Sequence, residues 1–192
     1  FWPANAPTKG PNGPCGPCSE IYYDQDPGSP LPSAKGLGTL PDRFLEVGNF
    51  VFTQFDRQED GSLPALPQNN IDVGLGLERI AAVLQDAPSN FETDLFAPTL
   101  DLLQSISGHN YGKDSQTDIR MRRIADRCRA VLFCMAAGAA PGREGRGYVV
   151  RKILRRAIRD GIGLGLEDTF LASLLPAVQA TMGDAYPQLR EQ

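Results

Sequence analysis

In the first part of the chain, apolar and polar positions follow the short period of extended strands. Positions 44–55 are rich in aromatic and β-branched residues, with apolar side chains at odd and even places, which predicts a central strand covered on both faces. A turn at 58–61 precedes a second predicted strand at 70–75, which leads into a helix over 77–85. A shorter strand is predicted at 21–23, between loops rich in proline and glycine. This order favours an antiparallel sheet backed by a helix.

From Ser115 onward the period lengthens to that of amphipathic helices. Four apolar residues recur at helical spacing on one face: Ile124, Cys128, Val131 and Met135. Three basic residues share another face: Arg120, Arg123 and Arg127. Gly138 marks the expected end of this helix.

Two further helices are predicted in the last part of the chain. The first covers 148–160 and ends at Gly161, and its outward face carries Arg151, Arg155 and Arg159. The second covers 170–182 and is expected to be broken or started by Pro176.

Glycines and polar residues cluster at 108–116, and we place a domain boundary there, between 1–112 and 113–192. The predicted fold class is therefore α+β, an antiparallel sheet flanked by helices and followed by an α-helical domain. No apolar run approaches the roughly 20 residues of a membrane span, so we expect no membrane partner. Because the chain opens at Phe1 without an initiator methionine or a targeting peptide, we expect it to be a piece of a longer polypeptide.

Charge is distributed unevenly around a net value of −4. Positions 119–160 hold twelve Lys and Arg against three acids, which leaves seven basic and twenty acidic residues elsewhere, or +9 beside −13. A basic segment of this kind indicates a polyanionic partner, and a solvated helix surface is the alternative.

Cys15 and Cys18 have the spacing of a thiol oxidoreductase, but the sequence after them predicts extended chain where that chemistry requires a helix N-terminus. The other cysteines lie on one helix far along the chain, and the only histidine, His109, lies in a loop, so we expect no zinc site. Four cysteines without a dense framework indicate a reducing compartment.

The segment Gly74-Leu-Gly-Leu-Glu-Arg79 places two glycines and an arginine where a strand runs into a helix. Gly74 and Gly76 allow a substrate to approach the backbone, and Arg79 offers a planar charged fork for a phosphate. Asp72, at the same strand end, suits an ammonium group. An exposed salt bridge for Arg79 and a turn cap for Asp72 are the alternatives. In the loop between the basic helices, Arg143 and Arg146 beside glycines are candidate phosphate contacts, or part of a mobile surface loop.

Taken together, several blocks resemble the alanyl-tRNA synthetases, which are class II aminoacyl-tRNA synthetases. The resemblance spans nearly the whole chain and is carried by the blocks at 13–24, 44–55, 71–85, 89–96, 123–126 and 145–157. It implies the second half of a class II catalytic (adenylation) domain at 1–112, and the start of a helical domain for the tRNA acceptor stem at 113–192.

The resemblance also implies an activity and partners. Alanine and Mg²⁺-ATP give alanyl-adenylate, and the alanyl group then passes to the 3′ end of tRNA(Ala), in the cytoplasm. The family's motifs 1 and 2 would lie upstream of Phe1, so we expect this chain to hold half of a catalytic site and not to aminoacylate alone.

By the same resemblance, the segment from Gly74 onward is class II motif 3, with Arg79 on the ATP γ-phosphate and Gly74 and Gly76 against the nucleotide. Asp72 corresponds to the carboxylate that holds the amino group of alanine, and Asn49 lines the alanine pocket. Glu46 belongs to the Mg²⁺-ATP environment. No residue is assigned as nucleophile or general base. The basic helices and their loop are implied to contact tRNA.

Four positions differ from the family's usual pattern: Gly48 for tryptophan, Val73 for threonine, Arg127 for histidine and Arg143 for asparagine. The first lies beside the alanine pocket, and the last lies where the family reads the wobble pair of the acceptor stem. The alternative function is therefore a diverged paralogue that binds RNA or makes an adenylate for another acceptor.

Overall fold

The computed structural model describes residues 1–32, 37–38, 40, 43–167 and 169–190. The chain forms two compact units, Phe1–Asp86 and Ala87–Gln192. Residues 87–112, which the sequence analysis groups with the catalytic domain, therefore pack within the second unit, and the functional boundary at 112 stays a prediction. The α+β class is confirmed, because the first unit is built on an antiparallel sheet and the second on helices.

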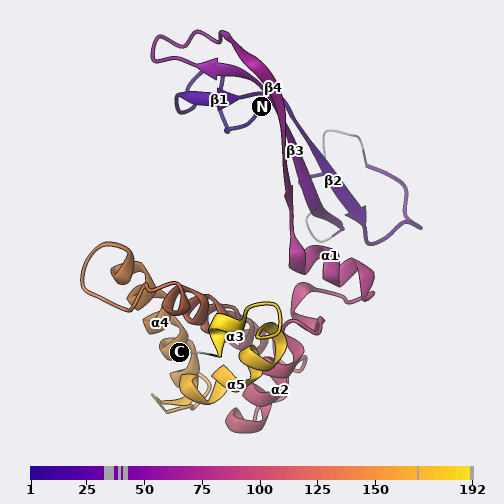
Figure 1. Cartoon of the computed structure of the whole chain (residues 1–192). Helices are drawn as coiled ribbons and strands as arrows, with labels where there is room; N and C mark the ends of the chain where they lie inside the picture. Colours follow the sequence, from indigo (N-terminus) through magenta and orange to yellow (C-terminus); the bar gives the residue numbers. More distant parts are fainter. Residues whose placement is uncertain (33–36, 39, 41–42, 168, 191–192) are drawn as a thin grey trace. The chain divides into compact units, whose positions relative to one another are not determined.

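The sheet of the first unit is organised around one long strand. Within the described residues, β3 (Phe44–Arg57) pairs antiparallel with β1 (Gly13–Cys15), β2 (Cys18–Asp24) and β4 (Ala65–Leu75). Helix α1 (Leu77–Leu84) follows β4 directly (Figure 1). The central position predicted for the strand at 44–55 is thus confirmed. Its burial is less complete than predicted, because most of its side chains are only half-buried.

Register shows how the other three strands share the edges of β3. Phe55 pairs with both Cys15 and Ala65, and Val51 pairs with both Cys18 and Asp72. Since a strand residue has one neighbour on each side, β4 occupies one edge of β3, and β1 and β2 follow one another along the other edge. Cys15 and Cys18 are therefore both on extended chain, as predicted, and both are free thiols.

The second unit is an assembly of four α-helices: α2 (Ala97–Ser107), α3 (Ser115–Ala136), α4 (Gly145–Ile162) and α5 (Phe170–Met182). Short 3₁₀ turns lie at Asn90–Glu92 (η2) and Pro187–Leu189 (η3). Its buried core includes Leu103, Met121, Ile124 and Leu174, all fully buried. Leu103 belongs to α2, a helix that the sequence analysis did not predict.

Two helix signals were read wrongly from the sequence. Pro176 neither breaks nor starts α5, which runs through it from Phe170 to Met182. Gly161 does not end α4, which continues to Ile162. Gly161 is there because the ring of Phe170 lies against it, so that a Cβ would come within 2.3 Å of the ring. The glycine serves close packing between α4 and α5, which the helix period does not reveal.

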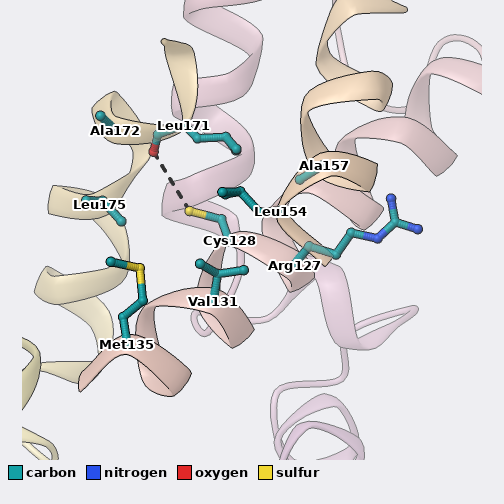
Figure 2. A pocket seen from close by; sticks show the side chains of 9 residues that line it. All are labelled: Arg127, Cys128, Val131, Met135, Leu154, Ala157, Leu171, Ala172 and Leu175. Atoms are coloured by element: carbon teal, nitrogen blue, oxygen red, sulfur yellow. Dashed lines mark hydrogen bonds between the residues drawn. The ribbon is translucent and has the colours of Figure 1, made fainter. Parts of the chain in front are cut away.

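An apolar cavity of about 150 Å³ lies among α3, α4 and α5 (Figure 2). Cys128 is one of its lining residues and lies 4.0 Å from the carbonyl oxygen of Leu171. Burial raises the pKa of the Cys128 thiol to about 11, so this thiol is protonated at neutral pH and is a poor nucleophile.

A polar network joins the η2 turn and the loop after α2 to α3. The Tyr111 hydroxyl donates to Glu92 at 2.6 Å, and Arg122 pairs with the same carboxylate at 3.2 Å. Burial would raise the pKa of Glu92, but hydrogen bonds from Ser89 and Tyr111 and the charge of Arg122 lower it.

No helix among the described residues is both long enough and apolar enough to cross a membrane.

The close approach of the chain at Gly16 leads to a stability prediction. A Cβ on Gly16 would lie 1.8 Å from the carbonyl oxygen of Phe52, which is backbone and has little freedom to yield. We expect Gly16→Ala to lower the free energy of unfolding by roughly 1–3 kcal/mol, the usual cost of overpacking, or more. Urea denaturation of the chain measures this. Gly28→Ala is the matched control, since its Cβ would meet nothing nearer than 4.0 Å. Equal stability of the two variants would contradict the prediction.

Candidate functional site

One face of the sheet gathers most of the residues predicted for small-molecule binding. Asn49 on β3 pairs with Gly74 on β4, and two residues further along β3 Val51 pairs with Asp72. Residues directly opposite each other, and residues two apart on one strand, project to the same face of a sheet. Asn49, Asp72 and Gly74 are therefore neighbours on one face.

A β-bulge brings Glu46 to this face as well. On β2, Ile21 and Tyr22 are consecutive, but they pair with Gly48 and Glu46, which leaves Val47 as an extra residue on β3. The bulge reverses the alternation of β3 at this point, since Tyr22 shares a face with Glu20, and Glu20 pairs with Asn49. Without the bulge, Glu46 and Asn49, three residues apart, would project to opposite faces.

Arg79 reaches the bulge from the helix. It lies in the first turn of α1, whose N-cap, Gly76, donates its backbone N–H to the carbonyl oxygen of Val47 at 3.1 Å. Nη1 of Arg79 donates to the carbonyl oxygen of Glu46 at 2.6 Å and lies 3.7 Å from Oε2 of the same residue. The side chains of Arg79 and Glu46 are 44% and 37% exposed. An ion pair this exposed contributes little to stability, so its arginine is available to an incoming phosphate.

Asn49 carries an acceptor without a donor. Its Oδ1 is buried and has no hydrogen-bond partner among the residues that the structure describes. A buried acceptor left unpaired costs free energy, and a ligand N–H or O–H removes that cost. Next to it, Gly74 has open space where a Cβ would project, and Asp72 is exposed. The amide oxygen of Asn49, the carboxylate of Asp72 and the free space at Gly74 together form a site suited to a small ammonium group.

Sequence reasoning missed two residues of this face, Glu20 and Tyr22. The Tyr22 hydroxyl donates to Oε2 of Glu20 at 2.5 Å. This hydrogen bond is the main cause that raises the pKa of Tyr22 to about 12, burial is the next, and the charges of Glu20 and Glu46 add to it. The alternation of Glu20, Ile21 and Tyr22 in a strand was the available signal, because it places both polar residues on one face.

Within the described residues, no group of three or more histidine, cysteine, aspartate or glutamate side chains is placed to hold a metal ion. The Glu46 carboxylate lies 3.7 Å from Arg79, so a cation that arrives with a phosphate substrate would meet a carboxylate and an arginine side by side. This arrangement suits Mg²⁺ carried by the substrate, which binds proteins through one or two carboxylates plus phosphates.

The predicted polyanion contacts lie in the second unit, in two settings. On α4 and in the loop before it, the side chains are exposed: Arg143, Arg146, Arg151, Arg155 and Arg159. On α3, Arg127 forms a short ion pair with Asp160 of α4, and Arg123 lies 3.9 Å from the same carboxylate. The guanidinium of Arg120 lies against Gly163, where a Cβ would come within 1.4 Å of Nη1.

Comparison with known proteins gives a consistent result. The family model for class II tRNA synthetases (A) matches residues 1–192. The chain is 48% identical to the alanine–tRNA ligase of Thermus thermophilus, over 100% of this chain and 22% of that protein. It is 50% identical to the alanine–tRNA ligase of Natranaerobius thermophilus, over 94% of this chain and 21% of that protein. The identity to the Acidithiobacillus ferridurans alanine–tRNA ligase is 47%, over 98% and 21%. The chain thus spans about a fifth of the length of these relatives.

The pair of Glu20 and Tyr22 leads to a prediction about pKa. Glu20→Gln removes the negative charge that opposes ionisation of the phenol, so we expect the pKa of Tyr22 to fall from about 12 toward its ordinary value of 10.0. An ultraviolet difference titration between each protein and its Tyr22→Phe counterpart isolates this step among the five tyrosines. In the control, Tyr23→Phe leaves the Tyr22 step in place. A Tyr22 step that stays at about 12 in the Glu20→Gln protein would show that Glu20 is not its cause.

Proposed function

The chain belongs to the family of class II tRNA synthetases, and from that membership we propose that it is part of an alanine–tRNA ligase. In this proposal the protein activates alanine with ATP and transfers the alanyl group to the 3′ end of tRNA(Ala), in the cytoplasm. Residues 1–112 supply part of the adenylation site, and residues 113–192 supply part of the surface for the acceptor stem.

The observation that carries the proposal is the set of Asn49, Asp72 and Gly74 on one face of the sheet. The unpartnered Oδ1 of Asn49 and the carboxylate of Asp72 are acceptors for the amino group of an α-amino acid. Gly74 leaves room above this face of the sheet for a small side chain or the nucleotide. A site with two acceptors and no competing basic residue opposite them on the paired strands favours a ligand that arrives as an ammonium.

The ATP phosphates are assigned to the strand and helix junction beside this set. Arg79 exchanges its exposed contact with Glu46 for the γ-phosphate, where its charge opposes the negative charge that develops on pyrophosphate. Glu46 stays within reach of the Mg²⁺ that accompanies ATP, and Gly76 brings the backbone close to the nucleotide. Magnesium neutralises phosphate charge when it is bound.

No protein nucleophile is needed for the activation step. The alanine carboxylate attacks the α-phosphorus of ATP, the bond to pyrophosphate breaks, and alanyl-adenylate forms. The chain contributes position and charge: Asp72 and Asn49 fix the amino end of alanine, and Arg79 fixes the leaving group. The contacts to the α-phosphate and the adenine are assigned to parts of the protein outside this chain, which spans about a fifth of its relatives.

The RNA contacts are proposed for the exposed arginines of α4 and of the loop before it. Arg146 lies in the first turn of α4, and Arg143 lies in the preceding loop, two residues before the helix begins at Gly145. The loop is held to the helix by the bond from the Gly142 N–H to the Gly147 carbonyl oxygen at 2.9 Å. RNA contact by Arg120, Arg123 and Arg127 stays a prediction, because their guanidinium groups lie at Asp160 and Gly163.

The decisive experiment is alanine-dependent exchange of pyrophosphate into ATP by the full-length protein, compared with its Asp72→Asn variant. We expect the amide to raise the alanine KM by roughly 10- to 100-fold, since hydrogen bonds to charged groups are worth about 1.5–3 kcal/mol. The KM for ATP should change little, because Asp72 faces the amino end of alanine.

Two results would overturn this assignment. An unchanged alanine KM and kcat in the Asp72→Asn protein would remove the role of Asp72 alone. Absence of exchange with alanine in the unmodified protein would remove the activity itself, and exchange with another amino acid would favour the diverged paralogue. Val73→Asn is a suitable control, because Val73 lies on the opposite face of β4.

Arg79 supports a second kinetic prediction. We expect Arg79→Ala to lower kcat for pyrophosphate exchange by about 100- to 1,000-fold, the range found when one transition-state contact to a developing charge is removed. Arg79→Lys should recover part of the loss. Thermal unfolding should change little in either variant, because the ion pair with Glu46 is exposed. A large fall in the unfolding temperature without a kinetic defect would assign Arg79 a structural role.

A further inference from the structure

A groove of about 200 Å³ runs along the exposed side of α4. It is lined by one aromatic and five basic side chains: Tyr148, Arg151, Lys152, Arg155, Arg156 and Arg159. Their spacing of three and four residues places all six on one stripe, and the stripe covers about 16 Å at 1.5 Å per residue. A run of cations of this length matches the backbone of a nucleic acid rather than a single small anion.

The cations of this stripe are not neutralised by the protein. In the part of the chain that the structure describes, none of the five forms an ion pair with aspartate or glutamate. Like charges at i and i+4 repel one another, so the stripe costs free energy in the unbound protein. A polyanion removes this cost. Tyr148, which is 52% exposed, adds a flat apolar surface that suits a base or ribose.

The arginines of α3 have a different environment. Arg127 and Asp160 are ion-paired, with side chains 21% and 13% exposed. Figure 2 shows the guanidinium of Arg127 directed away from the apolar cavity, which its stem lines together with Leu154 and Ala157 of α4. The side chain is therefore engaged along its length, by packing at the stem and by the carboxylate at the head.

We propose that Arg127 and Asp160 are positioning residues, which hold α4 against α3 so that its basic stripe is presented as one surface, and that the phosphate contacts come from α4. Arg120 belongs to the same support, at the C-terminal end of α4, whereas Arg123, 3.9 Å from Asp160 and with its side chain 55% exposed, stays accessible to a phosphate. This inference rests on the proposed RNA-binding function. It divides the basic residues into a contact set and a supporting set.

The test is the salt dependence of RNA binding by the full-length protein, with a short RNA duplex that has a single-stranded 3′ overhang as the probe. Each phosphate contact contributes roughly 0.9 to the slope of log affinity against log salt in duplex nucleic acid. We expect Arg155→Ala to reduce the slope by about one unit. Lys113→Ala, which removes one exposed charge outside the groove, should leave the slope unchanged.

For the positioning pair we expect a different signature. Arg127→Ala should weaken affinity by roughly three- to tenfold, a size typical of residues that act through another element, with the slope unchanged. Arg127→Lys should restore the affinity. Because Arg127→Ala leaves Asp160 buried and unpaired, the second variant is Arg127→Met with Asp160→Leu, which keeps the net charge and replaces the ion pair by apolar packing. It should fold and keep the wild-type slope.

A slope that falls by about one unit in the Arg127→Met, Asp160→Leu protein would show that Arg127 contacts phosphate and would overturn the inference. Unchanged affinity and slope in Arg127→Ala would remove the positioning role. These results are distinct from failure of the proposed function, in which the unmodified protein shows no salt-dependent binding of the RNA.

Discussion

The extra residue at Val47 is the constraint on which the candidate site depends. It changes the face to which Glu46 projects, so that Glu46 and Asn49 lie on the same side of β3. On the other edge of β3, the register with β4 continues past the pair of Gly48 and Leu75, so the Val47 carbonyl oxygen accepts from the Gly76 N–H, and this fixes the start of α1. Arg79 then reaches the carbonyl oxygen of Glu46 from the first helical turn. The bulge therefore brings Glu46 to the face of Asn49, and the register between β3 and β4 brings Arg79, the residue proposed for the phosphate, to Glu46.

The strands around the bulge show which parts of the fold could be predicted from the sequence and which could not. Beside the bulge, a Cβ on Gly48 would come within 2.7 Å of the Leu75 side-chain end, which is exposed and can move, so the strand contact itself does not require glycine there. The strand at 44–55 and the helix at 77–85 were predicted well, because local periodicity determines them, whereas the strand predicted at 70–75 is only the second half of β4 (Ala65–Leu75). The register between β2, β3 and β4 was not predictable from the pattern, since it depends on pairings between distant segments. For this reason Glu20 and Tyr22 were missed, although they lie on the same face as Asn49.

In the helical unit, the sequence likewise did not show which basic residues are paired with a carboxylate. Sequence identified the basic segment, and periodicity placed Arg120, Arg123 and Arg127 on one face of α3. It did not show that Asp160, one of only three acids in that segment, is buried against this face. One carboxylate is enough to hold Arg127, because a pair withdrawn from water is held much more tightly than an exposed one, whereas the side chain of Arg123 is 55% exposed. The formal count of charges therefore overstates the number of arginines available to a polyanion.

Two arginine–carboxylate pairs in this chain have the same chemistry and opposite consequences. Arg79 and Glu46 are 44% and 37% exposed and 3.7 Å apart, so water and salt screen their attraction, and the pair exchanges at little cost. Arg127 and Asp160 are 21% and 13% exposed, and separating them would leave a buried carboxylate without a partner. A phosphate can replace Glu46 as the partner of Arg79, because the side chain of Arg79 is already exposed and gives up no buried contact when it pairs with the phosphate. A phosphate that competed with Asp160 for Arg127 would first have to pull the stem of the side chain out of its packing with Leu154 and Ala157. Exposure, rather than residue type or spacing, is therefore what separates an arginine that binds from an arginine that supports.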